Sequence, residues 1–257
     1  MNRRQFLATT VAAAAAATTL NAAGEKETPC YEFRIYTAAE GKLDALHARF
    51  REHTLKIFEK HGMENIGYWV PVDNKENKLY YLLRHKSRAA KDASWKAFGS
   101  DPEWKKVAAE TEKNGRIVTK VESILLHTTD FTPDIKVESK SPARTFELRV
   151  YTCTPNNLPR LQSRFRDHTV KLFSKHGMTN YGYWLLDEGQ PAAADTLFYL
   201  LAHASKEAAA ASFDAFRKDP DWVKAKEASE KAAGGSLTVP DGVKSTFLVP
   251  TDYSPTK

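Results

Sequence analysis

The chain has few cysteines and none of the short motifs that identify the commonest enzyme classes. Its 257 residues include only two cysteines, Cys30 and Cys153, and neither has a neighbouring cysteine or a metal-ligand spacing. The patterns G-x-S-x-G, H-E-x-x-H and C-x-x-C are absent, as is a glycine-rich phosphate loop. A disulfide between the two cysteines would require an oxidising compartment.

The chain also lacks a strong excess of charge of one sign. The formal net charge is +6, and lysines and glutamates are interspersed along the predicted helices. Such mixing is typical of a solvated surface rather than of a nucleic-acid interface, so we expect no nucleic-acid partner. The content of 42% hydrophobic and 11% aromatic residues is ordinary for a soluble globular protein.

The first residues have the pattern of an export signal. Asn2-Arg3-Arg4-Gln5-Phe6-Leu7 resembles the twin-arginine signal, and an alanine-rich stretch and small residues around Ala22-Ala23 follow it. We therefore predict a signal peptide over residues 1–23 and a periplasmic or otherwise exported bacterial protein. The stretch is too short and too weakly apolar for a permanent span, so we expect no stable membrane span after cleavage. An uncleaved N-terminal anchor is the alternative.

An internal repeat defines the architecture. The segment 31–69 recurs at 146–184 without a gap, shifted by 115 positions. About half of the aligned positions are identical, and a repeat of this length indicates a duplicated domain rather than a short solenoid unit. We predict one domain over residues 29–132, a polar linker with two prolines over 133–144, and a second domain over 145–254.

Each copy has the same predicted order of elements. An alternating strand (32–37), an amphipathic helix (43–61), a strand hairpin (65–85), two short helices and a last strand (117–128) follow one another in the first copy. The second copy repeats this order, with its hairpin shifted by 118 positions. The order βαββαβ predicts an α+β fold of two tandem ferredoxin-like domains. Because helices cover one face of such a sheet only, we expect the two sheets to face each other and form an α+β barrel.

These motifs together resemble the NIPSNAP family, within the dimeric α+β barrel superfamily. The resemblance covers nearly all of the mature chain and is carried by segments present in both copies, namely Glu32-x-Arg34-x-Tyr36, Arg49-Phe50-x-x-His53, His61-Gly62-Met63, Gly67-Tyr68-Trp69, Tyr80-Tyr81-Leu82-Leu83-x-His85 and Asp101-Pro102-Glu103-Trp104, with their counterparts from Glu147 to Trp222. It implies face-to-face pairing around a cavity, within one chain or in a homodimer. Other branches of the superfamily include cofactor-free monooxygenases, haem-binding enzymes and isomerases; the family itself implies no catalytic residues.

The first strand of each copy carries the sharpest functional prediction. If Phe33 and Ile35 pack against the helices, then Glu32, Arg34 and Tyr36 face the barrel interior. Glu147, Arg149 and Tyr151 would do the same in the second copy. Such a face could orient an anionic or phenolic ligand, with tyrosine as a hydrogen-bond donor. The alternative is a structural ion pair that holds the two sheets together.

Several further residues are candidates for the wall of this cavity. They are the helix histidines His53 and His168, the strand tryptophans Trp69 and Trp184, and two tyrosine–histidine pairs, Tyr81 with His85 and Tyr199 with His203. Resemblance to the haem-binding barrels makes His53 and His168 candidate axial ligands, although such a histidine is more often a hydrogen-bonded residue at the edge of a core. We identify no cofactor and no metal site from the sequence.

From these observations we expect an exported protein that binds a small, partly aromatic molecule in the barrel cavity. The alternatives are a monooxygenase- or isomerase-like enzyme, with or without haem, and a scaffold whose barrel is filled by side chains. The sequence names neither the ligand nor a reaction.

Overall fold

The computed structural model describes residues 28–257, so the predicted signal peptide lies outside the described part of the chain. Eight strands form one closed barrel in the order β1-β3-β2-β8-β5-β7-β6-β4. The first copy comprises β1 (Cys30–Ala38), α1 (Leu43–Arg49), η1 (Phe50–Thr54), α2 (Leu55–Lys60), β2 (Glu64–Pro71), β3 (Lys78–His85), α3 (Arg88–Ser100), α4 (Pro102–Thr111) and β4 (Val118–Thr128). The second comprises β5 (Thr145–Cys153), α5 (Leu158–Arg164), η2 (Phe165–Thr169), α6 (Val170–Lys175), β6 (Thr179–Leu186), β7 (Thr196–His203), α7 (Lys206–Lys218), α8 (Pro220–Ala233) and β8 (Thr238–Pro250).

The observed elements follow local sequence signals closely. Ser87 caps α3 by accepting a hydrogen bond from the amide of Ala90, and Asp101 caps α4 at the amide of Glu103. The helix predicted over 43–61 contains a π-helical turn, η1, where the Thr54 hydroxyl donates to the carbonyl of Arg49 at 3.1 Å. The same turn recurs as η2 in the second copy. Local capping and periodicity therefore specify the helices, and the π turns add a feature that periodicity does not reveal.

The two copies pair within one chain rather than leaving open edges. Strand β2 pairs with β8 from Trp69 to Pro71, and β4 pairs with β6 from Leu126 to Thr128. Each junction is extended by the segment that follows the last strand of its copy. The amide of Thr251 donates to the carbonyl of Tyr68, and the amide of Thr129 donates to that of Tyr183. The barrel is thus closed by the chain itself.

The segment predicted as a linker lies along the barrel and contacts the C-terminus. The Arg144 Nε donates to the carbonyl of Lys257 at 3.0 Å, and the amide of Lys140 donates to the same carbonyl at 3.2 Å. The hydroxyl of Tyr181 donates to the carbonyl of Lys136. These contacts connect residues 133–144 to the second copy and to the C-terminus.

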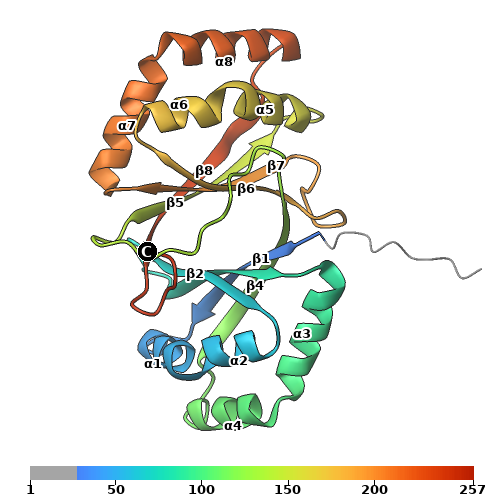
Figure 1. Cartoon of the computed structure of the whole chain (residues 1–257), viewed down its shortest axis with the longest axis vertical. Helices are drawn as coiled ribbons and strands as arrows, with labels where there is room; N and C mark the ends of the chain where they lie inside the picture. The colour runs from blue at the N-terminus through green and yellow to red at the C-terminus, as the bar shows by residue number, and fades with distance from the viewer. Residues whose placement is uncertain (1–27) are drawn as a thin grey trace, which may run out of the picture.

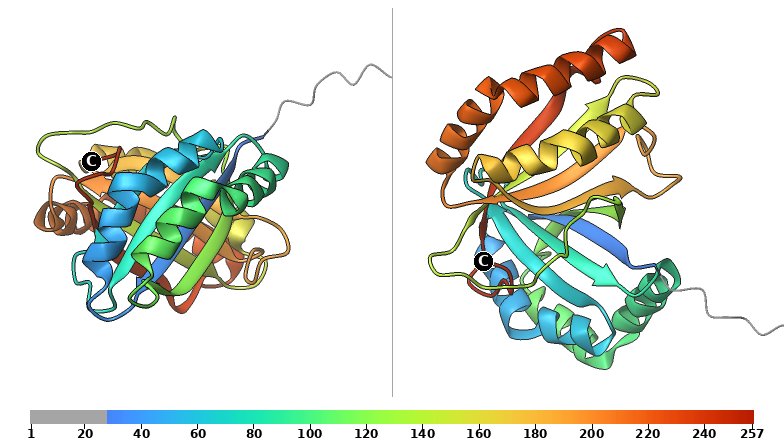
Figure 2. Two further views of the ribbon diagram at one scale, coloured as in Figure 1. Left: turned by 90° about the horizontal axis from the view of Figure 1, so that it is seen from below. Right: turned by 45° about the horizontal axis from the view of Figure 1, so that its top comes forward.

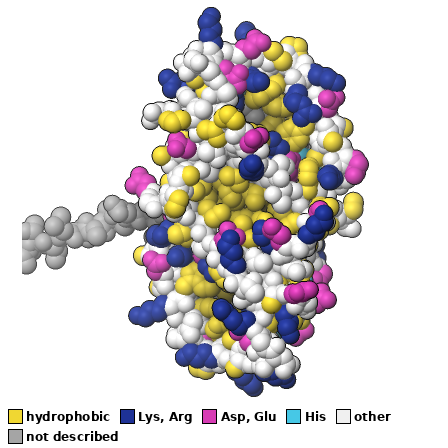
Figure 3. Space-filling model, turned by 180° about the vertical axis from the view of Figure 1, so that it is seen from behind, with side chains coloured by type: hydrophobic (Ala, Val, Ile, Leu, Met, Phe, Trp, Pro, Cys, Tyr) yellow, Lys and Arg dark blue, Asp and Glu magenta, His cyan; other side chains and the backbone are white. Residues whose placement is uncertain are grey.

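The helices cover the outside of the barrel, α1–α4 on one side and α5–α8 on the other (Figures 1 and 2). Figure 3 shows hydrophobic side chains gathered around the middle of one face, where the two copies meet. Within residues 28–257, no helix has the length and apolarity needed to cross a membrane.

The predicted orientation of the first strand is wrong. Phe33 lies inside the barrel, where its ring is 4.9 Å from that of Phe198 of the other copy, and Ile35 packs on the same cluster. Glu32, Arg34 and Tyr36 point outward to the helix layer, as do Glu147, Arg149 and Tyr151. Both faces of a helix-covered barrel wall are buried, so alternation alone does not tell which face is inside. Inside the barrel there are no helix side chains to act as polar partners. The apolar face of the strand therefore lies inside, and its polar face lies toward the helices.

The expected ligand cavity of the barrel interior is occupied by side chains. Buried aromatic and aliphatic residues from all eight strands form one cluster there, comprising Tyr31, Phe33, Ile66, Trp69, Tyr80, Leu82, Leu126, Phe146, Leu148, Tyr181, Trp184, Phe198, Leu200, Ala202 and Leu248. Two further clusters lie between the barrel wall and the helices of each copy.

Candidate functional site

A buried carboxylate forms the centre of a polar cluster between β1 and α3. Glu32 Oε1 accepts hydrogen bonds from Arg34 Nη1 at 2.5 Å and Ser123 Oγ at 2.6 Å. Its Oε2 accepts from the indole nitrogen of Trp95 at 2.6 Å and contacts His85 Nε2 at 3.2 Å. The donors come from β1, β4, α3 and β3, so the cluster joins four elements of the first copy.

These contacts keep Glu32 ionised. Burial alone would raise the pKa of its carboxyl, but the hydrogen bonds from His85, Ser123 and Trp95 and the charge of Arg34 outweigh burial and lower the pKa to about 2. An ionised carboxylate accepts hydrogen bonds only, so His85 must carry its proton on Nε2. In the neutral ring, Nδ1 of His85 is then a hydrogen-bond acceptor, and it has no partner within residues 28–257.

Arg34 extends the cluster toward Tyr36. Its guanidinium lies 4.3 Å from the ring centre of Trp95, and its Nη2 is 3.4 Å from the Tyr36 hydroxyl. The ring of Tyr81, opposite Arg34 on β3, packs 5.2 Å from that of Tyr36. The Glu32–Arg34 ion pair is therefore present, but on the helix side of the barrel wall, where it joins elements of the first copy instead of the two facing sheets.

The second copy has the same cluster with one donor fewer. Glu147 accepts from Arg149 and Ser245, both at 2.5 Å, and contacts His203 Nε2 at 3.1 Å. Phe213 occupies the place of Trp95 beneath the guanidinium and has no N–H to donate. The pKa of Glu147 is lowered: burial raises it, but hydrogen bonds from His203, Ser245 and Arg149 and the Arg149 charge outweigh burial.

The arginine of the second copy has more complete hydrogen bonding. Arg149 Nε donates to the Tyr199 hydroxyl at 2.9 Å, and Nη2 donates to the Tyr151 hydroxyl at 3.0 Å. In the first copy, Arg34 Nε and the Tyr81 hydroxyl have no partner among residues 28–257. The two clusters are therefore chemically distinct despite their shared sequence pattern.

A cavity of about 420 Å³ lies between the barrel wall and the helices of the first copy. Aromatic side chains from β1, η1, α2, α3 and α4 line it, and polar or charged groups lie among them. The lining comprises Tyr36, Arg49, Phe50, Thr54, Phe58, Phe98, Trp104, Ala108, Glu112, Arg116, Val118, Thr119 and Val121. Tyr36 is the residue of the predicted site that reaches this cavity.

Arg49 is the buried charge of this cavity. Its side chain is 5% exposed, its Nη1 donates to Glu112 at 3.0 Å, and its guanidinium lies 5.4 Å from the ring centre of Trp104. Its Nε has no partner within residues 28–257. A buried guanidinium with an unused N–H is a ready donor to an anionic ligand group.

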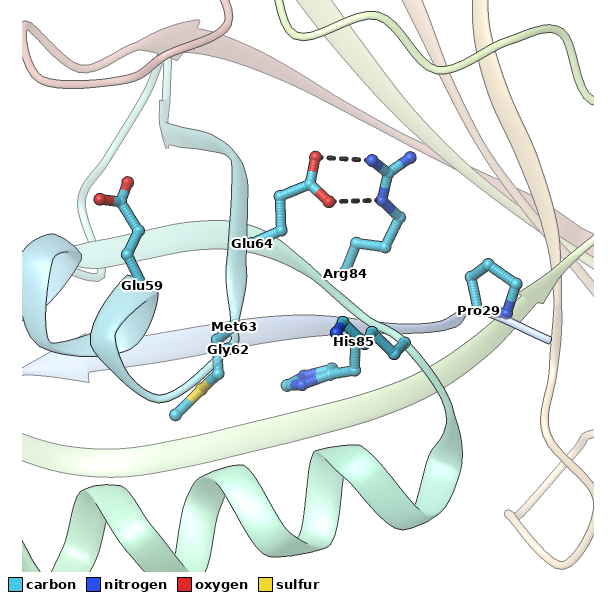
Figure 4. Close-up of a pocket in the computed structure, with 8 residues that line it drawn as sticks. Pro29, Glu59, Gly62, Met63, Glu64, Arg84 and His85 are labelled. Carbon is cyan, nitrogen blue, oxygen red and sulfur yellow. Dashed lines mark hydrogen bonds and ion pairs between the residues drawn. The ribbon is translucent and has the colours of Figure 1, made fainter. Parts of the chain in front are cut away.

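A second pocket, of about 590 Å³, opens beside the turn between α2 and β2. It is lined by Pro29, Glu59, Gly62, Met63, Glu64, Arg84, His85 and Lys86 (Figure 4). His85 thus belongs both to the Glu32 cluster and to the lining of this pocket. Figure 4 shows Glu64 and Arg84 facing each other across a two-bonded ion pair, with distances of 2.7 and 2.6 Å.

The remaining predicted site residues lie elsewhere. Trp69 and Trp184 face the barrel interior as expected, where they belong to the packed core. His53 lies on the outer side of η1 with a 42% exposed side chain. His168 is exposed and lines a groove of about 320 Å³ between α5, η2 and α8.

The positions of His53 and His168 concern the prediction that they are axial ligands of a haem, which stays a prediction. Neither His53 nor His168 lines the cavity that holds Tyr36 and Arg49, so an axial ligand does not project into it. Among the residues described, no group of three or more histidine, cysteine, aspartate or glutamate side chains is arranged to hold a metal ion. Cys30 and Cys153 are both buried free thiols.

Sequence analysis missed Trp95, Ser123 and Arg49 as site residues. Arg49 carried a usable signal, because it stands three residues after Leu46 on the apolar face of its helix, and Arg164 recurs at the same place. A charge repeated on an apolar stripe indicates a buried, partnered group. Ser123 had no signal of its own, since its place opposite Arg34 follows from strand register alone.

Comparison with known proteins agrees with this architecture. A protein of Lactobacillus acidophilus described as a candidate monooxygenase aligns with a TM-score of 0.54 and 15% identity, over 87% of this chain and 94% of its own. A similarly described protein of Fusobacterium nucleatum aligns with a TM-score of 0.57 and 13% identity, over 88% and 94%. At these identities the likeness shows the fold alone, an α+β barrel built from two ferredoxin-like units.

Within that class, sequence comparison defines the family. The NIPSNAP profile matches residues 31–133 and again 146–255. The chain is 24% identical over 229 residues to mouse Protein NipSnap homolog 3B, an alignment that covers 88% of this chain and 85% of the mouse protein. The chain belongs to the NIPSNAP family.

Proposed function

We propose that the protein binds a small aromatic anion in the cavity between the helix layer and the barrel wall of the first copy. The observation that carries the proposal is the buried Arg49 guanidinium, with its unpartnered Nε, in a cavity whose wall includes five aromatic side chains. The volume of about 420 Å³ lies within the range of about 300–1,000 Å³ of small-molecule sites.

Each part of the cavity fits one part of such a ligand. Phe50, Phe98 and Trp104 offer ring faces and edges for an aromatic ring. Arg49 offers the donor for a carboxylate, and Tyr36 offers a hydroxyl for a second oxygen. The proposed ligand belongs to the class expected from the sequence. The proposed binding site lies in the helix layer instead of the barrel interior.

The test is isothermal titration of the protein with benzoate and 4-hydroxybenzoate. Replacing Arg49 by Gln should weaken binding at least tenfold, about 1.4 kcal/mol, because a hydrogen bond to a charged group is lost. Arg164 of the second copy is the matched control, because its Nε also has no partner within residues 28–257 but no phenylalanine, tyrosine or tryptophan lines its groove. Arg164→Gln should bind like the unaltered protein.

Two ligand controls separate the contributions. Cyclohexanecarboxylate keeps the charge without the aromatic ring, and benzamide keeps the aromatic ring without the charge, so both should bind more weakly than benzoate. Equal weakening by Arg49→Gln and Arg164→Gln, or no binding by the unaltered protein, would refute the proposal. Thermal unfolding of each variant checks that the fold is retained.

An enzyme of monooxygenase or isomerase type is the second proposal. It is supported by the descriptions of the two structural neighbours and by the Tyr36 hydroxyl, which lies in the cavity wall beside Arg34. Mass spectrometry of a bound aromatic ligand after incubation in air, with and without added haem, tests it. Turnover that Tyr36→Phe abolishes would support an enzyme; an unchanged ligand under every condition would exclude this reaction for the compounds tried.

Export is also proposed, from the twin-arginine pattern at Arg3 and Arg4. N-terminal sequencing of the protein recovered from the periplasm tests it. A mature N-terminus near residue 24 is the expected result, and retention of the whole chain in the cytoplasm would contradict it.

A further inference from the structure

The pocket beside the α2–β2 turn has in its wall a buried ring nitrogen, an acceptor in the neutral imidazole, that the Glu32 cluster leaves unused. The side chain of His85 is fully buried, and its Nε2 is engaged by Glu32. Its Nδ1 has no partner within residues 28–257. Figure 4 shows the imidazole among the lining residues of the pocket, directed toward Met63.

Charged groups of both signs line the same pocket. Glu64 and Arg84 neutralise each other, whereas Glu59 accepts one hydrogen bond at Oε1, from the amide of Asn65 at 3.0 Å. Lys86 is exposed at the rim and follows His85 directly. The open pocket therefore presents the Glu59 carboxylate and one ammonium group, while His85 Nδ1 is buried in its wall.

The second copy shows which of these features the fold requires. It keeps the carboxylate–histidine pair, with His203 Nδ1 also unpartnered within the described chain. At the positions of the four charged lining residues it has Ser174, Thr179, Ala202 and Ala204. The buried pair is thus common to both copies, while the charged surroundings belong to the first copy only.

We infer that this pocket binds a small zwitterion that carries an ammonium group with free N–H bonds and a carboxylate, as an α-amino acid does. The ammonium donates to His85 Nδ1 and to Glu59, and the carboxylate pairs with Lys86. Because Nδ1 is buried, the ligand displaces the side chain of Met63, which is unbranched and adaptable. This site is separate from the Arg49 cavity, and the inference does not depend on the function proposed there.

The test uses the whole protein labelled with ¹⁵N-histidine and titrated with glycine, L-alanine and L-leucine. A hydrogen bond accepted at Nδ1 changes the nitrogen resonance of His85, and His203 of the same molecule is the internal control. The expected result is a saturable shift of the His85 Nδ1 resonance with that of His203 unchanged. No shift at His85, or equal shifts at both histidines, would overturn the inference.

Two ligands and two variants test the roles of the charges. Betaine has no N–H and acetate has no ammonium, so neither should shift His85; an equal shift by either one would refute the zwitterion assignment. Lys86→Ala and Glu59→Gln should each weaken the affinity at least tenfold. Lys206 lies in the second copy near Phe247, and Lys206→Ala should leave the affinity unchanged. Unaltered affinity in both pocket variants would likewise refute the inference.

Discussion

At the scale of single residues, Glu32 and Glu147 occupy equivalent places and differ by one hydrogen bond. Trp95 donates to Glu32, whereas Phe213 cannot donate to Glu147. Both carboxylates have lowered pKa values although burial opposes this, because their donors outweigh desolvation. Each cluster is therefore a stabilising ion pair as well as a candidate polar site.

Acid unfolding measures the contribution of Glu32. Its pKa is lowered from 4.5 to about 2 in the folded state, so its stabilisation is complete above about pH 5 and is lost as the pH falls toward 2. The shift corresponds to about 3 kcal/mol. Trp95→Phe gives the first copy the pattern of the second, and we expect it to lower the free energy of unfolding at pH 7 by about 1.5–3 kcal/mol.

The same variant should move the acid transition to higher pH, because the pKa of Glu32 rises when the indole donor is lost. Urea unfolding between pH 2 and 7 provides the measurement. Phe213→Leu is the control, since it removes no hydrogen bond. Identical pH dependence of Trp95→Phe and the unaltered protein would show that the indole does not stabilise the carboxylate.

The sequence predicts which residues share a face of the first strand, because both copies have the same alternation. It does not predict whether that face points into the barrel or toward the helices. Alternation along β1 separates Phe33 and Ile35 from Glu32, Arg34 and Tyr36 correctly. The direction of each set depends on which buried face has polar partners, and those partners, Trp95 and Ser123, lie on other elements. Strand register supplies this information, and a single strand does not contain it.

At the scale of elements, β2 and β6 contain a bulge that the hairpin pattern does not reveal. The register against β3 shifts between Asn65 and Gly67, and the indole of Trp69 folds back over Gly67. A Cβ at Gly67 would lie 2.2 Å from a ring carbon of Trp69. Gly182 and Trp184 repeat the arrangement in β6.

Gly67→Ala should destabilise the protein by about 1–3 kcal/mol, as overpacking of a core does. Gly99, in α3, is the control, because a Cβ there meets nothing within 4 Å. Gly99→Ala should raise the free energy of unfolding by about 0.5–1 kcal/mol, since alanine favours a helix over glycine. Thermal or urea unfolding of both variants measures these changes. An unchanged free energy of unfolding in Gly67→Ala would mean that Trp69 does not pack over Gly67.

At the scale of the whole molecule, the duplication predicted two facing sheets, and it left open whether they pair within one chain. The closed strand order within one chain answers this, through the short β2–β8 and β4–β6 junctions and the segments that extend them. Sequence repeats do not encode this choice, because the same faces would pair equally well between chains. The location of cavities was also unpredictable, since it depends on how completely side chains from eight strands fill the interior.

The barrel interior is packed with side chains, and the cavity of the first copy lies in its helix layer. A small aromatic anion should therefore bind beside Arg49 and Trp104 rather than within the barrel. A crystal of the protein grown with 4-bromobenzoate tests this directly, because anomalous scattering locates the bromine. We expect a bromine peak in the helix-layer cavity of the first copy, absent in Arg49→Gln and present in Arg164→Gln. A peak inside the barrel among Phe33, Trp69 and Phe198, or no peak in the helix layer, would contradict it.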